Sequence, residues 1–287
     1  LAVPVSKQYP NGLKPIYVAR RTASQGSERE AVGKALADQA MTELAPTLVT
    51  WRPGLVFHLA AQASVPFSHR DPIRDLAVNV VGSHRVGLAA REAGAERIVF
   101  VSSGGAVYGE TPRPASERTL PSPTSYYGVH KLTAEGHIAL SGIPYAIARP
   151  SNVYGPRQST GLEGAVVASF LEQAANSNSV QIHGDGRQVR DFIHVHDAIE
   201  ALWRLASADA GIGIWNVSSG RSIAVTELAD LVEAALGRPL ERRLGPRRLG
   251  DVHRSSLTSA RLRASGWRPT VTLKAGLRQL VRDSVRG

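Results

Sequence analysis

The chain has 287 residues, of which 43% are hydrophobic and 20% are charged, a composition that suits a globular protein with a sizeable core and not a disordered chain. It contains no cysteine, which excludes disulfide bonds and metal sites built on thiolates. Its 34 lysines and arginines outnumber its 24 aspartates and glutamates, and the formal net charge of +10 suits an anionic partner such as a small diphosphate.

The first fifty residues differ from the rest of the chain. An ordinary dinucleotide-binding fold opens with a hydrophobic strand and a glycine-rich turn that leads into a helix. Here residues 1–22 show no clean hydrophobic period, and Gln25–Leu44 is at best a polar helix. The early glycines, which stand too far apart to make that turn, are Gly12, Gly26 and Gly33. Residues 1–50 are therefore interpreted as an atypical segment in place of the usual glycine-rich strand and helix.

From residue 55 onward, short apolar runs alternate with helical patterns, which is typical of a parallel sheet with crossover helices. The predicted strands are Leu55–Leu59, Arg97–Val101 and Tyr145–Ala148. The predicted helices are Asp75–Ala93, Ser125–Leu140, Ala165–Asn176, Val195–Ala208 and Val225–Leu236. The predicted fold class is α/β, with a doubly wound parallel sheet.

A tyrosine and a lysine stand four residues apart in the predicted helix Ser125–Leu140, and that spacing puts Tyr127 and Lys131 on one helix face. An ammonium beside a phenol lowers the pKa of the phenol because it stabilises the phenolate. A phenol with such a pKa can take or return a hydroxyl proton near neutral pH. The spacing alone is common by chance, so an exposed pair without a function is the alternative unless neighbouring motifs support a site.

Two strand ends flank this helix in the sequence. Val99–Gly109 runs from a strand into a turn of small residues that includes Ser102 and Ser103, and Arg149–Gln158 follows the next strand. Open α/β sheets bind their ligands at the carboxyl ends of the strands. The three segments together therefore predict a ligand site that contains the tyrosine and lysine pair.

Several segments match a known family in their order along the chain. They are Val56–Ala63, Val78–Val80, Ser102–Gly109, Tyr127–Lys131, Arg149–Gln158, Gly184–Phe192, Trp215–Val217 and Arg248–Asp251. With them, from about Trp51 to Trp267, the sequence resembles the extended short-chain dehydrogenases that act on nucleotide sugars, and within them the UDP-glucose 4-epimerase branch. The resemblance implies a Rossmann-like NAD-binding domain at 51–158. It also implies a smaller α/β region at 159–287 that mainly binds the nucleotide sugar, with some segments returning to the Rossmann core.

The resemblance also implies roles for individual residues. Tyr127 is expected to be the catalytic acid/base, while Lys131 lowers its pKa and holds the nicotinamide ribose of NAD. The residues expected to bind the cofactor are Ala60, Ala61, Ala63, Asn79, Ser102, Tyr127, Lys131 and Pro150. Those expected to bind the nucleotide-diphosphate sugar are Ser103, Tyr127, Asn152, Arg190, Arg248 and Asp251. Simpler interpretations stay open, since Asn152 could cap a turn and Arg190 could pair with Asp191.

The third catalytic residue and the reaction follow from one small motif. Many relatives carry serine or threonine three residues before the valine of the Val-Tyr-Gly motif, where this chain has Gly104. Ser103 is therefore the catalytic candidate, with Ser102 in reserve. Members of the dehydratase branch carry an Asp-Glu pair at the positions where this chain has Gly104 and Gly105. This difference favours a 4-epimerase that works through a transient 4-keto sugar. A 4,6-dehydratase and a 4-keto reductase are the alternatives, and the sugar and the base stay open.

The missing glycine-rich turn removes the main expected contact with the pyrophosphate of NAD. Three explanations compete. The first is a start that comes from a shifted reading frame or from a truncated or artificial sequence. The second is a divergent segment that rebuilds the site. The third is a degenerate relative that binds nucleotide sugars without catalysis. The abrupt change in similarity near residue 45 favours the first explanation.

The remaining expectations concern partners and location. The basic residues lack the interleaved aromatic residues of single-strand-binding proteins, so no nucleic-acid partner is expected. No apolar run approaches the roughly 18 residues of a membrane span, so no membrane partner is expected and the cytoplasm is the expected location. His194 and His196 lack an identifiable third ligand, so no metal is expected. The resemblance implies a homodimer, with Asp75–Ala93 and Ser125–Leu140 as candidate interface helices.

Overall fold

The computed structural model describes residues 15–18, 46–158, 160, 165–247 and 251–286. The chain divides into two compact units that alternate along the sequence. The first unit consists of Leu1–Ser102, Tyr126–Ala148 and Leu205–Ile214, and the second of Ser103–Ser125, Arg149–Arg204 and Trp215–Gly287. The domain boundaries expected at residues 50 and 158 stay a prediction.

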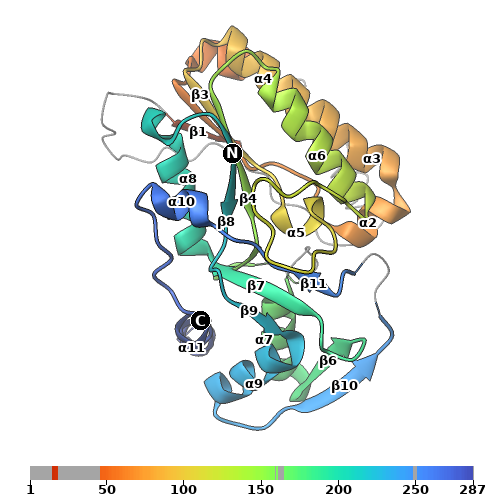
Figure 1. Cartoon of the computed structure of the whole chain (residues 1–287). Coiled ribbons are helices and arrows are strands. Elements are labelled where there is room, and N and C mark those ends of the chain that lie inside the picture. The colour runs from red at the N-terminus through yellow and green to blue at the C-terminus, as the bar shows by residue number, and fades with distance from the viewer. Residues whose placement is uncertain (1–14, 19–45, 159, 161–164, 248–250, 287) are drawn as a thin grey trace. The chain divides into compact units, whose positions relative to one another are not determined.

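A five-stranded sheet with the order β1-β2-β3-β4-β8 lies mainly in the first unit, while the last residues of β4 and β8 belong to the second (Figure 1). Its strands are β1 (Pro15–Val18), β2 (Leu55–His58), β3 (Arg97–Val101), β4 (Tyr145–Pro150) and β8 (Gly213–Val217). The pairs β1/β2, β2/β3 and β3/β4 are parallel. Strands β2 and β3 are almost entirely buried, as expected for parallel strands covered on both faces. The three predicted strands and the parallel α/β class are confirmed.

Strand β1 was not predicted from the sequence. Its four residues are too few for an alternating pattern to stand out, and its proline occupies the first position, where a missing N–H group is tolerated. Parallel pairing with β2 holds these four residues in an extended conformation, from Pro15 opposite Leu55 to Val18 opposite His58. The N-terminal segment therefore keeps the first strand of the sheet. Residues 46–51 are helical, whereas the predicted helix Gln25–Leu44 lies outside the described residues.

The predicted helix Asp75–Ala93 consists of three consecutive pieces. They are α3 (Pro72–Leu76), the π-helical turn η1 (Ala77–Val81) and α4 (Gly82–Glu92). The helix begins earlier than predicted because the Asp71 side chain accepts a hydrogen bond from the Arg74 N–H at 3.0 Å, and because Pro72 suits the first helical position. The prediction missed the π turn, since a backbone slip of this kind leaves the apolar pattern nearly unchanged.

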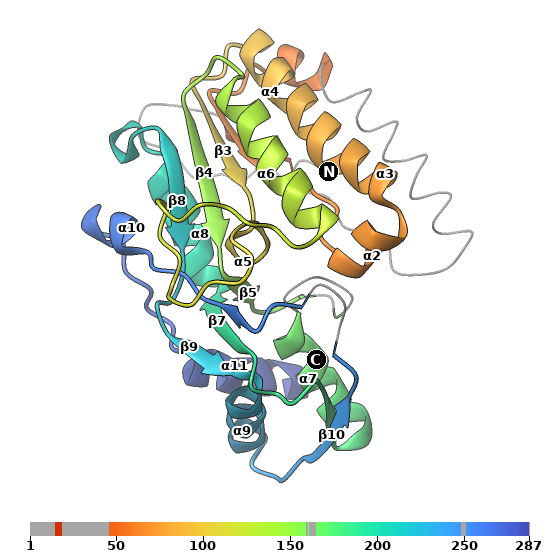
Figure 2. The same cartoon turned by 45° about the vertical axis from the view of Figure 1, so that its right-hand side comes forward.

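Helix α6 (Tyr126–Ala139), which confirms the predicted helix Ser125–Leu140, lies alongside α4 in both views (Figures 1 and 2). It also packs against α3 and α2 (Val65–Arg70). Ala134 and Ile138 are fully buried in the core of this unit. Because they continue the stripe of Tyr127 and Lys131, that stripe is the buried face of α6.

The second unit contains two smaller sheets, of orders β10-β6 and β11-β7-β5, with β9 also paired to β7. Its strands are β5 (Asn152–Tyr154), β6 (Ser179–His183), β7 (Val189–His194), β9 (Ser222–Ala224), β10 (Glu241–Gly245) and β11 (Arg254–Ser255). Its helices, including one that ends in the first unit, are α5 (Gly104–Val107), α7 (Val166–Ser177), α8 (Val195–Ala206), α9 (Val225–Leu236), α10 (Ala260–Ala264) and α11 (Leu273–Arg286). Phe170, Phe192, Leu228 and Leu277 belong to its core.

The helices α7, α8 and α9 confirm the three helices predicted in this part of the sequence. His194 ends β7, while His196 lies in the first turn of α8. Within the described ranges, no helix is long and apolar enough to cross a membrane.

Candidate active site

The tyrosine and lysine pair lies on helix α6 of the first unit. Tyr127 and Lys131 are buried, with exposed fractions of 6% and 1%. The Nζ of Lys131 donates a hydrogen bond to the backbone oxygen of Val101 at 2.7 Å and lies 4.2 Å from the centre of the Phe100 ring. Val101 is the last residue of β3, so the ammonium stands at the carboxyl end of a parallel strand. Ligands of open α/β sheets bind at such strand ends.

The surroundings of Lys131 control its charge. Burial lowers the pKa of the Lys131 ammonium from 10.5 to about 7, and the carboxylates of Glu135 and Asp75 oppose that decrease. Glu135 is buried one helical turn after Lys131 and accepts a hydrogen bond from the hydroxyl of Ser102. A bound anion or phenolate beside Lys131 would therefore shift it toward its charged form.

Replacement of Lys131 by methionine is expected to change stability in a pH-dependent way. Because the folded-state pKa of about 7 lies below the unfolded value of 10.5, the unfolded chain binds a proton that the folded protein lacks between these two pH values. As the pH falls through this window, the unaltered protein should lose stability relative to Lys131→Met, by up to about 1.4 kcal/mol per pH unit. Urea unfolding of both proteins across the window measures the difference. A difference that stays constant with pH would contradict a buried, perturbed ammonium.

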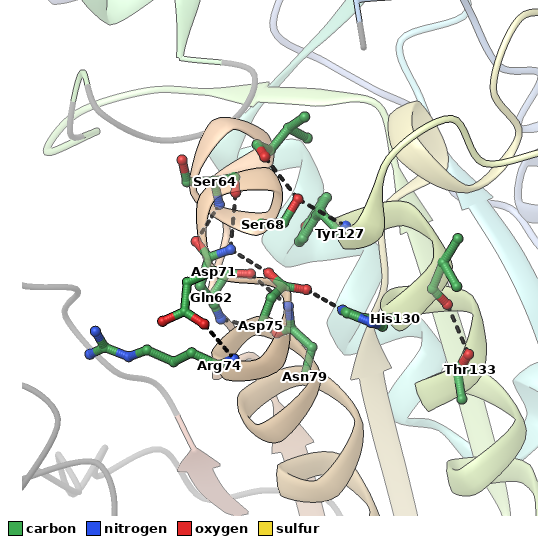
Figure 3. A network of polar contacts seen from close by, with 12 residues as sticks. Gln62, Ser64, Ser68, Asp71, Arg74, Asp75, Asn79, Tyr127, His130 and Thr133 are labelled. Carbon is green, nitrogen blue, oxygen red and sulfur yellow. Dashed lines mark hydrogen bonds and ion pairs between the residues drawn. The ribbon is translucent and has the colours of Figure 1, made fainter. Parts of the chain in front are cut away.

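The predicted cofactor loop, Ala60–Ala63, follows strand β2. Its three alanines are half-buried, and their methyl side chains leave the backbone open to close approach. Asn79 holds this loop, since its Oδ1 accepts from the Gln62 N–H and its Nδ2 donates to the Gln62 carbonyl oxygen, both at 3.0 Å (Figure 3). Asn79 therefore fixes the backbone of the loop, while its contact with a cofactor stays a prediction.

The second unit contains other residues that the sequence assigned to the site. Ser103 is the half-buried N-cap residue of α5, and its carbonyl oxygen accepts from the Val107 N–H at 3.0 Å. Pro150 is the last residue of β4, and Asn152 is the first of β5. The Nδ2 of Asn152 donates to the backbone oxygen of Asp191 at 3.2 Å. Asn152 thus links β5 to β7 instead of capping a turn.

Gly104, at the position where many relatives carry a hydroxyl, has no room for a side chain. A Cβ atom there would lie 2.4 Å from Leu257 Cδ1 and 3.1 Å from the backbone oxygen of Arg149. At Gly105 the nearest atom would be Ser255 Oγ, at 3.4 Å. Leu257 is buried and so has little freedom to move away. The packing of this chain therefore accounts for a glycine at position 104.

The two neighbouring glycines are expected to respond differently to alanine. Gly104→Ala should lower the free energy of unfolding by about 1–3 kcal/mol, because the added methyl overpacks a filled site. Gly105→Ala, the matched control, should cost less than about 1 kcal/mol, since its contacts are ordinary and alanine is the better helix former. Urea unfolding of the two variants checks the difference, and equal losses would contradict the packing described here.

Arg190 pairs with Asp251, not with Asp191. Its Nη2 donates to the Asp251 carboxylate and, at 2.7 Å, to the backbone oxygen of Val252. The structure therefore brings together two residues that the sequence assigned to substrate binding. Arg248, which the sequence also assigned to substrate binding, lies outside the described residues.

A hollow of about 210 Å³ lies beside this ion pair in the second unit. Its lining residues are His183, Gly184, Asp185, Gln188, Arg247, Asp251 and His253. Guanidinium and imidazole groups in such a lining suit a polar, anionic ligand. In the part of the chain that the structure describes, no three histidine or carboxylate side chains form a group that could hold a metal ion.

Asp191 has a structural role that the sequence did not reveal. It is fully buried, and its Oδ1 accepts from the Ser151 hydroxyl at 2.9 Å and from both the N–H and the hydroxyl of Ser219 at 3.0 Å. Its Oδ2 accepts from the Gly220 N–H at 2.9 Å. Burial raises the pKa of the Asp191 carboxyl, and these hydrogen bonds oppose the increase. Asp191 thus ties β7 to the turn that follows β8.

Three polar residues near the pair, namely Gln62, Asp75 and His130, were also missed as parts of the site. Asp75 is fully buried and lies 2.6 Å from the Nδ1 of His130, measured from its Oδ2 (Figure 3). The one signal in the sequence was the place of His130 directly before Lys131. The direction of a polar side chain on a helix depends on its neighbours in space. The positions of residues along the sequence therefore could not identify Asp75 as a neighbour of the reactive pair.

Comparison with known families covers most of the chain. Residues 11–218 match the family described as "NAD dependent epimerase/dehydratase family". The match begins well before Trp51, so it includes much of the N-terminal segment that the motifs in the sequence did not reach.

Individual relatives agree with the family match. A UDP-glucose 4-epimerase from Mycolicibacterium smegmatis is 39% identical over 251 residues, which cover 85% of this chain and 80% of the relative. The structure of Thermus thermophilus UDP-glucose 4-epimerase in complex with NAD has a TM-score of 0.80 and 37% identity, over 86% of this chain and 82% of that one. The Thermotoga maritima UDP-glucose 4-epimerase with UDP-glucose has a TM-score of 0.78 and 35% identity, over 85% and 82%.

Proposed function

Because this chain belongs to the NAD-dependent epimerase/dehydratase family, we propose that it is an NAD-dependent nucleotide-sugar 4-epimerase of the UDP-glucose type. The UDP-glucose 4-epimerases of Mycolicibacterium smegmatis and Thermus thermophilus match 85% and 86% of this chain. The observation that carries the proposal is the buried pair on α6, with the Lys131 ammonium at the carboxyl end of β3 and Tyr127 one turn before it. Buried ionisable groups in such a place are typical of reactive sites.

The residues around this pair fit a dinucleotide. An ammonium has three N–H donors, and among the described residues that of Lys131 makes one hydrogen bond, to Val101. The remaining donors suit the hydroxyls of a ribose. The small side chains of Ala60–Ala63 suit a group that approaches the backbone closely. When bound, NAD supplies reversible hydride transfer, and the protein supplies orientation and proton transfer.

Each catalytic role belongs to a named side chain in this proposal. Tyr127 takes the proton of the sugar C4 hydroxyl and returns it when the 4-keto sugar is reduced on its other face. Lys131 stabilises the phenolate, and Ser103 is the candidate that donates a hydrogen bond to the reacting oxygen. Asn152, Arg190, Arg248 and Asp251 hold the nucleotide diphosphate and its ribose, a role that the polar hollow beside Arg190 and Asp251 supports.

We also propose that the protein acts as a homodimer in the cytoplasm. Exposed apolar side chains on the helices of the first unit support a partner surface, namely Ile73 on α3, Leu88 on α4 and Val129 on α6. Light scattering on the purified protein tests the dimer, and a mass equal to one chain at working concentrations would contradict it.

The first experiment measures the cofactor directly. Purified protein is denatured, the released NAD is quantified by chromatography, and the native protein is then incubated with UDP-glucose and UDP-galactose. Retained or readily bound NAD together with interconversion of the two sugars would support the epimerase. A 4-keto-6-deoxy product would indicate the dehydratase, and net reduction of a 4-keto sugar would indicate the reductase. A protein that neither retains nor binds NAD would be the degenerate, sugar-binding relative.

A further inference from the structure

Asp75 is the centre of a buried polar network in the first unit (Figure 3). Its side chain is fully buried on α3, and both carboxylate oxygens are engaged. Oδ1 accepts a hydrogen bond from the Gln62 side-chain amide, and Oδ2 lies 2.6 Å from the Nδ1 of His130. A buried carboxylate is stable only with such partners, so the positions of all three side chains depend on one another.

One end of the network fixes the Ala60–Ala63 loop. The side-chain amide of Gln62 folds back on its own loop, accepting from the Ser64 N–H at 2.6 Å and donating to the Ser64 carbonyl oxygen at 3.0 Å. The backbone of Gln62 is held separately by Asn79 at 3.0 Å. Asp75 therefore acts on the loop through the side chain of Gln62, and the other hydrogen bonds of that side chain define the shape of the loop.

The other end fixes the start of helix α6. His130 stands directly before Lys131 and three residues after Tyr127, and it is buried. The α2–α3 segment makes a second contact with the first turn of α6, in which the Tyr127 N–H donates a hydrogen bond to the Ser68 hydroxyl at 3.1 Å. In Figure 3 the His130 ring points from α6 toward Asp75. A displacement of His130 would thus displace its neighbours on the helix.

Gln62 and His130 are connected through Asp75, and no hydrogen bond between the two appears among the described residues. We propose that Gln62, Asp75 and His130 form a bridge that couples the Ala60–Ala63 loop to helix α6, so that NAD binding at the loop and the placement of Tyr127 and Lys131 depend on each other. The three are positioning residues, and their role rests on the proposed function. An apolar contact could pack these elements together, but a hydrogen-bonded carboxylate permits a single relative arrangement.

A double-mutant cycle between the two ends tests the bridge. Gln62→Met removes the amide from the loop end, and His130→Leu removes the ring nitrogen from the helix end. The readouts are the dissociation constant of NAD, measured by calorimetry, and the free energy of unfolding. We expect each single variant to weaken NAD binding by about 10-fold and the double variant to be little weaker than either one, because one bridge is broken in all three.

Two further variants separate coupling from a general loss of packing. His130→Asn places an amide N–H donor near the position of Nδ1 and should restore NAD affinity to within about 3-fold of the unaltered protein. Thr133→Val is the matched control on the same helix, since the exposed Thr133 hydroxyl donates to Val129 of its own helix at 2.9 Å, and its NAD affinity should be unchanged.

The possible outcomes are distinct. Multiplicative effects of the two single variants would overturn the bridge, and so would a His130→Leu variant that loses stability but binds NAD normally. If the unaltered protein binds no NAD at all, the proposed function itself fails, and the role of the bridge in cofactor binding fails with it.

Discussion

Tyr127→Phe is expected to slow the interconversion of UDP-glucose and UDP-galactose by about 10²–10⁴-fold, because positioned proton transfer contributes that much to such reactions. The substitution removes the phenol oxygen and keeps the buried ring. The contact that holds the start of α6 is made by the backbone N–H of Tyr127 and does not involve the phenol. NAD content should therefore stay close to that of the unaltered protein.

The neighbouring residue provides the control for this prediction. Tyr126 lies on the same helix, is 48% exposed, and would lose an equivalent oxygen in Tyr126→Phe. That variant should keep nearly full activity. Initial rates of both variants, measured with saturating UDP-glucose, decide the question. More than about a tenth of the activity remaining in Tyr127→Phe would contradict its role as the acid/base.

Asp191→Ala is expected to lower the free energy of unfolding by about 3–5 kcal/mol, because several buried donors lose their acceptor at once. Two of these donors are the backbone N–H groups of Ser219 and Gly220, which cannot turn toward another partner. Urea unfolding followed by circular dichroism measures the loss.

An isosteric variant separates the hydrogen bonds from the packing at this position. Asp191→Asn keeps one acceptor oxygen and the shape of the side chain, so its loss should be clearly smaller than that of Asp191→Ala. Losses of equal size in the two variants, or a loss below about 1 kcal/mol for alanine, would show that these hydrogen bonds do not hold the turn in place.

Local patterns predicted the elements that carry the reactive pair. Strands β2, β3 and β4 have apolar runs bounded by turn residues, and the spacing of Tyr127 and Lys131 fixes their common face once α6 is helical. Both are properties of neighbouring residues along the chain. Strand β1 was not predicted, because its four residues are held extended by pairing with β2 and not by a pattern of their own.

The environment of the reactive pair could not be predicted in this way. The low pKa of Lys131 arises from burial of its ammonium and is opposed by two carboxylates, of which Asp75 lies on a separate helix. The lack of space at Gly104 comes from Leu257, far away in the sequence. Such effects depend on contacts between residues that are distant in the sequence, and a single sequence does not show directly which residues make these contacts.

The alternation of the two units along the chain has a consequence for synthesis. The chain passes between the units at residues 102/103, 125/126, 148/149, 204/205 and 214/215. The first unit is therefore incomplete until Ile214 has left the ribosome, although it includes Leu1. Domains usually fold one after another as the nascent chain emerges. Here that order is unavailable, and no single cut in the gene would yield a fragment that contains one complete unit and nothing of the other.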